Sequence, residues 1–276
     1  MTKFIADSSC DITELNGVDF QSVPLTISTD KVMFTDDSDM DIHDMLNVLE
    51  KHKGRSYTAC PGVEGWTNAF EGADEIFVVT ITSGMSGTYN SAMAAVKIYL
   101  EEHPVVKIKV IDSKSTGPGM RLILEKLAEY YKNGMDFDSI CAAIDKYMKK
   151  TRLFCSLFSL HNLAQNGRVS KVVASAAGVL GICVIGTASE QGTLDSIAKC
   201  RGEKKLVARL KELMTASGYN GGRLRICHVE NEGLARNISD IVKKSYPNAD
   251  VLYYKAGGLC SYYAERGGII LALETE

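Results

Sequence analysis

The stretch EIFVVTITSGMSGTYNSAMAAVKIYL, residues 75–100, decides the fold class of this 276-residue chain. Residues 75–82 are apolar and rich in β-branched side chains, which predicts a buried strand. Glycine and serine in residues 83–88 predict a turn, and residues 89–100 carry apolar side chains at helical spacing. A buried strand followed by a turn and a helix is typical of an α/β protein with a parallel sheet.

Outward from this unit, apolar runs alternate with amphipathic segments, and we expect a parallel-sheet α/β domain over residues 1–155. The spacing changes after residue 150, which predicts a second α/β domain over residues 156–276, packed against the first because no linker composition separates them. Further strands are expected at residues 4–6, 105–111, 153–157, 178–188, 224–229, 249–255 and 268–273, an extended segment at 18–27, helices at 41–51, 118–131, 136–150, 206–217 and 234–245, and one helix opened by Pro61.

Composition narrows the class of protein. Hydrophobic residues make up 45% of the chain and charged residues 24%, as in a globular protein with a sizeable core. Thirty-four acidic and 31 basic residues give a net charge of −3, and no basic stripe favours nucleic acid. The first residues contain no apolar segment of the kind found in signal peptides, and no segment favours membrane insertion. The eight cysteines are scattered along the chain, which predicts buried, reduced thiols. We expect a cytoplasmic protein.

Three predicted strands end in loops rich in hydroxyl groups: residues 7–9, 82–88 and 112–115. Such loops gather at the carboxyl edge of a parallel sheet, where ligands bind. The middle loop leads into a helix, whose free N–H groups, together with Ser83, Ser86 and Thr88, would suit a carboxylate or a phosphate. The alternative is that glycine and serine only build a turn and a helix cap.

Known enzyme motifs fit poorly. The nucleophile elbow G-x-S-x-G, the phosphate loop with its lysine and the G-x-G-x-x-G fingerprint are all missing. The five histidines lie away from the hydroxyl loops, and neither histidines nor cysteines have the spacing of a metal site, so we expect no metal and no cofactor. Asp7 and Asp112 are candidate bases or metal ligands, although accepting backbone hydrogen bonds within their own turns is the favoured interpretation.

Two arginines are candidates for binding an anion. Arg168 lies in an Asn-Gly-Arg turn and Arg201 in the segment Lys-Cys-Arg-Gly. Each could pair with a ligand or with an acidic residue across the domain junction, and the default for both is a solvated side chain.

Taken together, these segments resemble the DegV family of bacterial fatty-acid-binding proteins. The match covers nearly the whole chain, and its specific parts are the S-G-M-S-G-T-Y and N-G-R-V-S segments. The matching segments are IADSSCD (5–11), VPL (23–25), TACPG (58–62), TSGMSGTYNSA (82–92), VIDSKS (110–115) and LAQNGRVSK (163–171).

The resemblance implies a two-domain α/β protein with a parallel sheet in the first domain and a mixed sheet in the second. It also implies that a long-chain fatty acid such as palmitate, stearate or oleate is bound as ligand, with no catalytic residues. By the family pattern, Thr58 and Ser86 hold its carboxylate, and Gly87 and Thr88 complete the loop. Family members of known role hand the fatty acid to a partner kinase, which phosphorylates the carboxylate.

The chain departs from the family pattern at two places. Where the family commonly has T-S-x-P, this chain has Thr58-Ala59-Cys60-Pro61, so one hydroxyl beside the expected carboxylate site is missing. Tyr263 stands where many members have a histidine, and tyrosine can donate a hydrogen bond without carrying a positive charge. Arg201 aligns with an arginine that is functional in kinase-linked members.

The leading hypothesis is therefore a protein that binds a fatty acid and presents its carboxylate to a fatty acid kinase. Its rival is a hydrolase or phosphate-handling enzyme that uses Ser86 or Asp112 in a short, polar pocket. A third possibility is a lipid-dependent regulator, which the lack of a basic patch makes unsuited to direct DNA binding.

Overall fold

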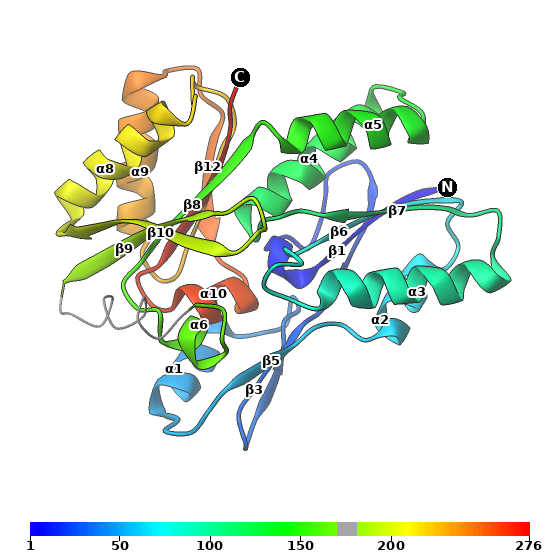
Figure 1. Cartoon of the computed structure of the whole chain (residues 1–276), viewed down its shortest axis with the longest axis horizontal. Helices are drawn as coiled ribbons and strands as arrows, with labels where there is room; N and C mark the ends of the chain where they lie inside the picture. The colour runs from blue at the N-terminus through cyan, green and yellow to red at the C-terminus, as the bar shows by residue number, and fades with distance from the viewer. Residues whose placement is uncertain (170–180) are drawn as a thin grey trace.

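The fold is built around two β-sheets with helices on both faces of each (Figure 1). The structure is a computed structural model of the whole chain, and it describes residues 1–169 and 181–276. From one side to the other, the layers are a helix pair, a parallel sheet, a second helix pair, a mixed sheet and a third helix pair.

The first half of the chain forms a four-stranded sheet in the order β2-β1-β6-β7, and all of its neighbouring strands are parallel. Chain order reverses between β1 and β6, where ligands bind in open parallel sheets. The loops after β1, β6 and β7 therefore share one edge, as expected from the sequence. The strands are β1 (Thr2–Asp7), β2 (Asp19–Val23), β6 (Glu75–Thr80) and β7 (Lys107–Asp112).

Alternate residues of these strands bury against different helices. Ile5 and Val78 pack with Trp66 of α2 (Val63–Phe70) and with α3 (Thr88–Glu102), whereas Phe4 and Phe77 face α4 (Pro118–Lys132) and α5 (Phe137–Met148). A sheet whose two faces are both apolar must be covered on both sides, which explains the α/β/α layering.

The second half forms a six-stranded mixed sheet in the order β10-β9-β8-β13-β11-β12, in which only β11 and β12 are parallel. Helices α8 (Glu203–Ala216) and α9 (Glu232–Ser245) cover its outer face, while α4 lies between the two sheets and packs on β8, β11 and β13. The strands are β8 (Thr151–Leu157), β9 (Ile182–Ala188), β10 (Leu194–Arg201), β11 (Leu224–His228), β12 (Val251–Lys255) and β13 (Ile269–Glu274).

A group of short elements packs together beside the two sheets, at the bottom of the view in Figure 1. The strands β3, β4 and β5 form a small antiparallel sheet in the order β4-β3-β5, and α10 packs on η1, α1, β3 and α6. These elements are η1 (Ser8–Cys10), β3 (Thr26–Ser28), β4 (Met33–Thr35), β5 (Tyr57–Ala59), α1 (Ile42–Lys51), α6 (His161–Gln165) and α10 (Gly258–Ala264).

The sequence pattern predicts most of the long elements but not all of the short ones. It predicts no strand at β10 and no helix at α6 or α10. The expected strand at residues 178–188 corresponds to β9, and its first three residues, like the end of the LAQNGRVSK motif, lie outside the described residues. The expected domain boundary after residue 155 lies inside β8. In the described part of the chain, no helix combines the length and the apolar character needed to cross a membrane.

Candidate ligand-binding site

The candidate site is a cavity of about 310 Å³ between the two sheets. Its volume is at the lower end of the range of small-molecule sites. Most of its wall is apolar, and α10, the β6–α3 loop and the inner face of the mixed sheet all contribute to it. The apolar wall residues include Leu25, Ile81, Met85, Leu153, Cys155, Leu157, Leu163, Leu194, Leu259, Cys260 and Ile270.

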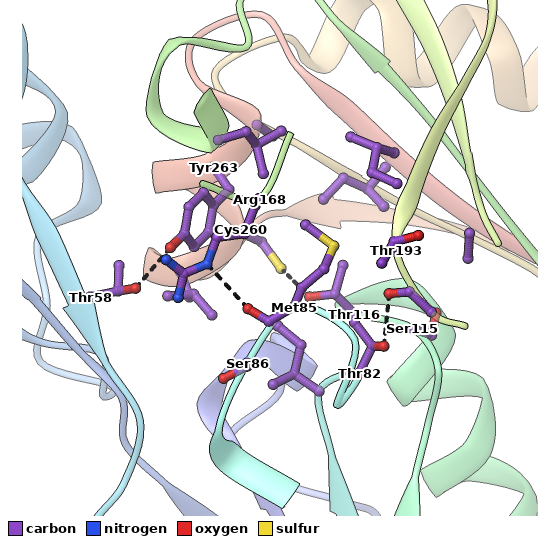
Figure 2. A pocket seen from close by; sticks show the side chains of 18 of the residues that line it. Thr58, Thr82, Met85, Ser86, Ser115, Thr116, Arg168, Thr193, Cys260 and Tyr263 are labelled. Atoms are coloured by element: carbon purple, nitrogen blue, oxygen red, sulfur yellow. Dashed lines mark hydrogen bonds between the residues drawn. The ribbon is translucent and has the colours of Figure 1, made fainter. Parts of the chain in front are cut away.

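Hydroxyl side chains line this cavity in two places, as Figure 2 shows: Thr58, Ser86 and Tyr263 at one end, which we call the hydroxyl end, and Thr82, Ser115, Thr116 and Thr193 toward the other. The hydroxyl oxygens of Thr58 and Tyr263 lie 2.8 Å apart, and Ser86 lies close by on the same side of the view. Thr58 is held in β5 opposite Ile27 of β3, whereas Tyr263 comes from α10. The structure thus brings three of the sequence-predicted residues to one place from segments that are far apart in the chain.

Ser86 lies in the turn that opens α3. Its Oγ is 2.8 Å from Oγ1 of Thr88 and accepts a hydrogen bond from the Thr88 N–H at 3.3 Å. Gly87, the N-cap residue of α3, lines the cavity and makes no side-chain cap. A ligand oxygen next to Ser86 and Gly87 would lie near the positive end of the helix dipole.

Arg168 brings a positive charge to this end of the cavity, although the default expectation from the sequence is a solvated side chain. Its Nε donates to the carbonyl oxygen of Met85 at 3.1 Å, and its guanidinium lies 5.9 Å from the centre of the Tyr263 ring. No carboxylate pairs with it among the residues that the structure describes. An anionic ligand would therefore be the natural counter-charge.

Three other predicted residues lie elsewhere. Ser83 is bonded to Asp112 through its backbone N–H at 2.9 Å and through its hydroxyl group. Thr88 is fully buried at the start of α3. Arg201 is exposed at the end of β10. None of these three is a wall residue of the cavity.

The two candidate aspartates act in their own turns, as the favoured interpretation predicts. Asp7 accepts from the Ser9 N–H at 3.1 Å, and Asp112 accepts from the Lys114 N–H at 3.3 Å. Burial would raise the pKa of Asp112, but hydrogen bonds from Lys114 and Ser83 outweigh burial and hold this pKa below its usual value. A carboxylate held in this way is a poor general base.

The geometry around Ser86 gives little support to the rival enzyme hypothesis. Within the described part of the chain, its hydroxyl bonds only to Thr88, and no base lies within hydrogen-bonding distance of it. A nucleophilic serine needs such a base. No group of three or more metal-ligating side chains occurs among the described residues either.

The fold and the site define an α/β protein with an internal apolar cavity that ends in hydroxyl groups. A sequence model described as "Uncharacterised protein, DegV family" matches residues 1–275. The chain therefore belongs to the DegV family, and the resemblance seen in the sequence is confirmed.

Relatives of this chain match it over nearly its whole length. A DegV domain-containing protein of Streptococcus gordonii is 41% identical over 276 residues, which cover 99% of this chain and 98% of that protein. The structure is similar to that of a DegV family protein from Eubacterium eligens loaded with heptadecanoic acid, with 67% identity, a TM-score of 0.99 and full coverage of both chains. It is also similar to the Streptococcus pneumoniae Fatty Acid Kinase (Fak) B3 protein loaded with linoleic acid, with 40% identity, a TM-score of 0.98 and coverage of 100% and 99%.

Proposed function

We propose that this protein binds one long-chain fatty acid, with the acyl chain in the apolar cavity and the carboxylate at its hydroxyl end. The observation that carries this proposal is a mostly apolar cavity wall with the hydroxyl groups of Thr58, Ser86 and Tyr263 together at one end, beside Arg168. The other wall hydroxyl groups, those of Thr82, Ser115, Thr116 and Thr193, lie away from that end (Figure 2). Relatives with 67% and 40% identity hold fatty acids in the same fold, which supports the same class of ligand here.

The energetics fit an acyl chain. Burial of about 0.8 kcal/mol per methylene gives a C16 chain a gross stabilisation of roughly 10 kcal/mol, before the costs of association and ordering. Hydrogen bonds to the carboxylate add less affinity, but they fix which end of the ligand faces the hydroxyl groups. Arg168 supplies a positive charge at that end, and Gly87 places the start of α3 beside it.

We further propose that the protein presents the carboxylate to a fatty acid kinase, which would phosphorylate it. The hydroxyl end of the cavity lies near the surface, because the wall residues Cys60 and Gly87 are exposed there. A carboxylate at this position could be reached by a partner protein while the acyl chain stays buried. The S. pneumoniae relative is named as a protein of the fatty acid kinase, which supports this role.

In this proposal the protein binds and presents its ligand and catalyses nothing itself. A cytoplasmic location agrees with the eight free cysteines, of which five are buried, since persistent disulfides are typical of oxidising compartments. Arg201, exposed and remote from the cavity wall, remains a candidate contact for the kinase.

A binding titration tests the carboxylate site. Delipidated protein is titrated with palmitate and with methyl palmitate, which keeps the acyl chain but has no anionic carboxylate. We expect the double variant Thr58→Ala/Ser86→Ala to bind palmitate at least about tenfold more weakly and methyl palmitate with little change. The matched control Thr67→Ala/Ser245→Ala removes two hydroxyl groups that, in the described part of the chain, bond only to carbonyl groups of their own helices. Unchanged palmitate binding by the first double variant would contradict the assignment.

A further inference from the structure

We infer that Tyr262 is the positioning residue of the carboxylate site, although it is not part of the cavity wall. Its buried hydroxyl group joins the three segments that carry Thr58, Tyr263 and Arg168. The inference rests on the proposed function, because it concerns how the proposed carboxylate site is held together.

The Tyr262 hydroxyl has partners on two other segments. The side chain is fully buried, and its Oη lies 2.7 Å from Oγ of Ser56 and accepts a hydrogen bond from Nδ2 of Asn166 at 2.8 Å. The Tyr262 carbonyl oxygen accepts a further bond from Nδ2 of Asn162 at 2.8 Å. One tyrosine thus binds the residue before β5 and two residues of the segment formed by α6 and its C-cap Asn166, which we call the α6 corner.

Each partner of Tyr262 is a close neighbour of a residue at the hydroxyl end of the cavity. Ser56 directly precedes β5 and lies two positions before Thr58. Both hydroxyl groups contact α10: Ser56 meets Tyr262, and Thr58 meets Tyr263. The same two tyrosines are adjacent on α10, with ring centres 4.8 Å apart in an edge-on arrangement.

Asn166 provides the corresponding link to Arg168. Arg168 donates from Nη1 to the carbonyl oxygen of Asn166, whose side chain donates to Tyr262. The α6 corner is also bound to the start of β5, because Oε1 of Gln165 accepts from the Ser56 N–H at 3.2 Å and from its Oγ at 3.3 Å. Thr58, Tyr263 and Arg168 are therefore each attached, one or two residues away, to a bond of this network.

Loss of the Tyr262 hydroxyl would remove one hydrogen-bond partner from the buried Ser56 and one from the half-buried Asn166. Buried groups recover lost hydrogen bonds by moving, because leaving them unmade is costly. Movement at Ser56 and Asn166 would shift Thr58 and Arg168 relative to Tyr263. The apolar part of the wall lies mainly on the strands of the mixed sheet, with Leu163 from α6 and Leu259 from α10, and none of its described residues bonds to this hydroxyl.

The test is Tyr262→Phe, which removes one oxygen atom and keeps the ring. We expect palmitate affinity to fall about tenfold while methyl palmitate affinity changes less than about twofold, so the preference for the carboxylate falls about tenfold. A purely structural role would weaken both ligands equally. Tyr254→Phe is the matched control, because the Tyr254 hydroxyl is also buried but has no hydrogen-bond partner among residues 1–169 and 181–276 and lies outside the cavity wall.

Ser56→Ala provides a second route if Tyr262→Phe does not fold, since it removes one partner and keeps the tyrosine. The expected change is in the same direction and smaller. Equal loss of both ligands, or an unchanged preference for palmitate in the variants that fold, would overturn the inference. Failure of the wild-type protein to bind palmitate, or to prefer it over methyl palmitate, would instead contradict the proposed function.

Discussion

The hydroxyl oxygens of Thr58 and Tyr263 are 2.8 Å apart although 205 residues separate them in the chain. This contact joins the small antiparallel sheet to α10 at the end of the cavity where we place the carboxylate. Each hydroxyl can bond to its neighbour and to a ligand oxygen, since a hydroxyl has one donor and two acceptor sites.

Tyr263→Phe should weaken the binding of palmitate by about fivefold, because it removes one donor near the carboxylate and keeps the apolar ring. The Arg168 guanidinium would still face the ring and limit the loss. Displacement of a fluorescent fatty acid measures this change. Palmitate binding equal to that of the wild-type protein would show that Tyr263 does not contact the carboxylate.

Gly84→Ala should accelerate fatty acid release. The turn between β9 and β10 closes part of the cavity, and its Gly192 carbonyl accepts from Oγ1 of Thr82 at 2.8 Å. A Cβ atom on Gly84 would lie 2.4 Å from the carbonyl oxygen of Gln191 and push this turn away. We expect release to become about fivefold faster, consistent with roughly 1 kcal/mol of overpacking.

The transfer of bound fatty acid to lipid vesicles gives this release rate. Gly233→Ala is the control, because no atom of another described segment lies within 4 Å of its added Cβ atom. Release from Gly84→Ala at the rate of the control would show that the turn does not retain the ligand.

Ala188→Leu should shift the preferred ligand toward shorter acyl chains. Ala188 lies at the end of β9 in the cavity wall, and leucine would add three carbon atoms to that wall. We expect the optimum chain length to fall by roughly two or three carbons, because the volume that the leucine side chain fills is no longer open to the acyl chain. Competition between C12 and C18 fatty acids measures the shift, and an unchanged optimum would place the acyl chain elsewhere.

The stability that Asp11 contributes should fall as the pH rises from 5.5 to 8. Burial raises the pKa of Asp11 to about 7, and the charge of Asp36 adds to the effect. The folded state thus binds a proton more tightly than the unfolded chain, whose value is near 3.8. This contribution is full below about pH 4 and is lost as the pH rises through about 7.

Asp11→Asn should flatten this pH profile, because asparagine keeps the acceptor for the Gly257 N–H but cannot titrate. Asp7, with a pKa raised by burial to about 6, acts in the same direction and leaves part of the slope. Urea unfolding at both pH values measures the free energy, with the exposed Asp19→Asn as control. An unchanged slope in Asp11→Asn would show that Asp11 does not titrate in this range.

Local signals explain which parts of the fold can be read from the sequence. The β6–α3 unit is predicted because an apolar run, the glycines of a turn and apolar side chains at helical spacing follow one another within 26 residues. Helix α10 is not predicted, because it has only seven residues and is preceded by a glycine. The N–H groups of Gly258 and Leu259 bond to Asp36, more than 200 residues away, so this helix depends on tertiary structure.

The candidate site, like the fold, is predicted where the signal is local in sequence and missed where it depends on tertiary structure. Residues 83–88 are correctly identified as a polar turn, but their three hydroxyl groups go to different places. Ser83 bonds to Asp112, Thr88 is buried at the helix start, and only Ser86 reaches the cavity. The direction of each side chain depends on the backbone of the turn, which composition alone does not predict. The role of Arg168 could not be assigned for a related reason, because Met85 and Tyr263, which it contacts, are both distant from it in sequence.

Native mass spectrometry of the purified protein, followed by denaturing lipid extraction, tests the central claim most directly. We predict one adduct per chain with the mass of a long-chain fatty acid, and recovery of that acid in the extract. A clean mass of the protein alone that shows no uptake of added palmitate, stearate or oleate would contradict the account.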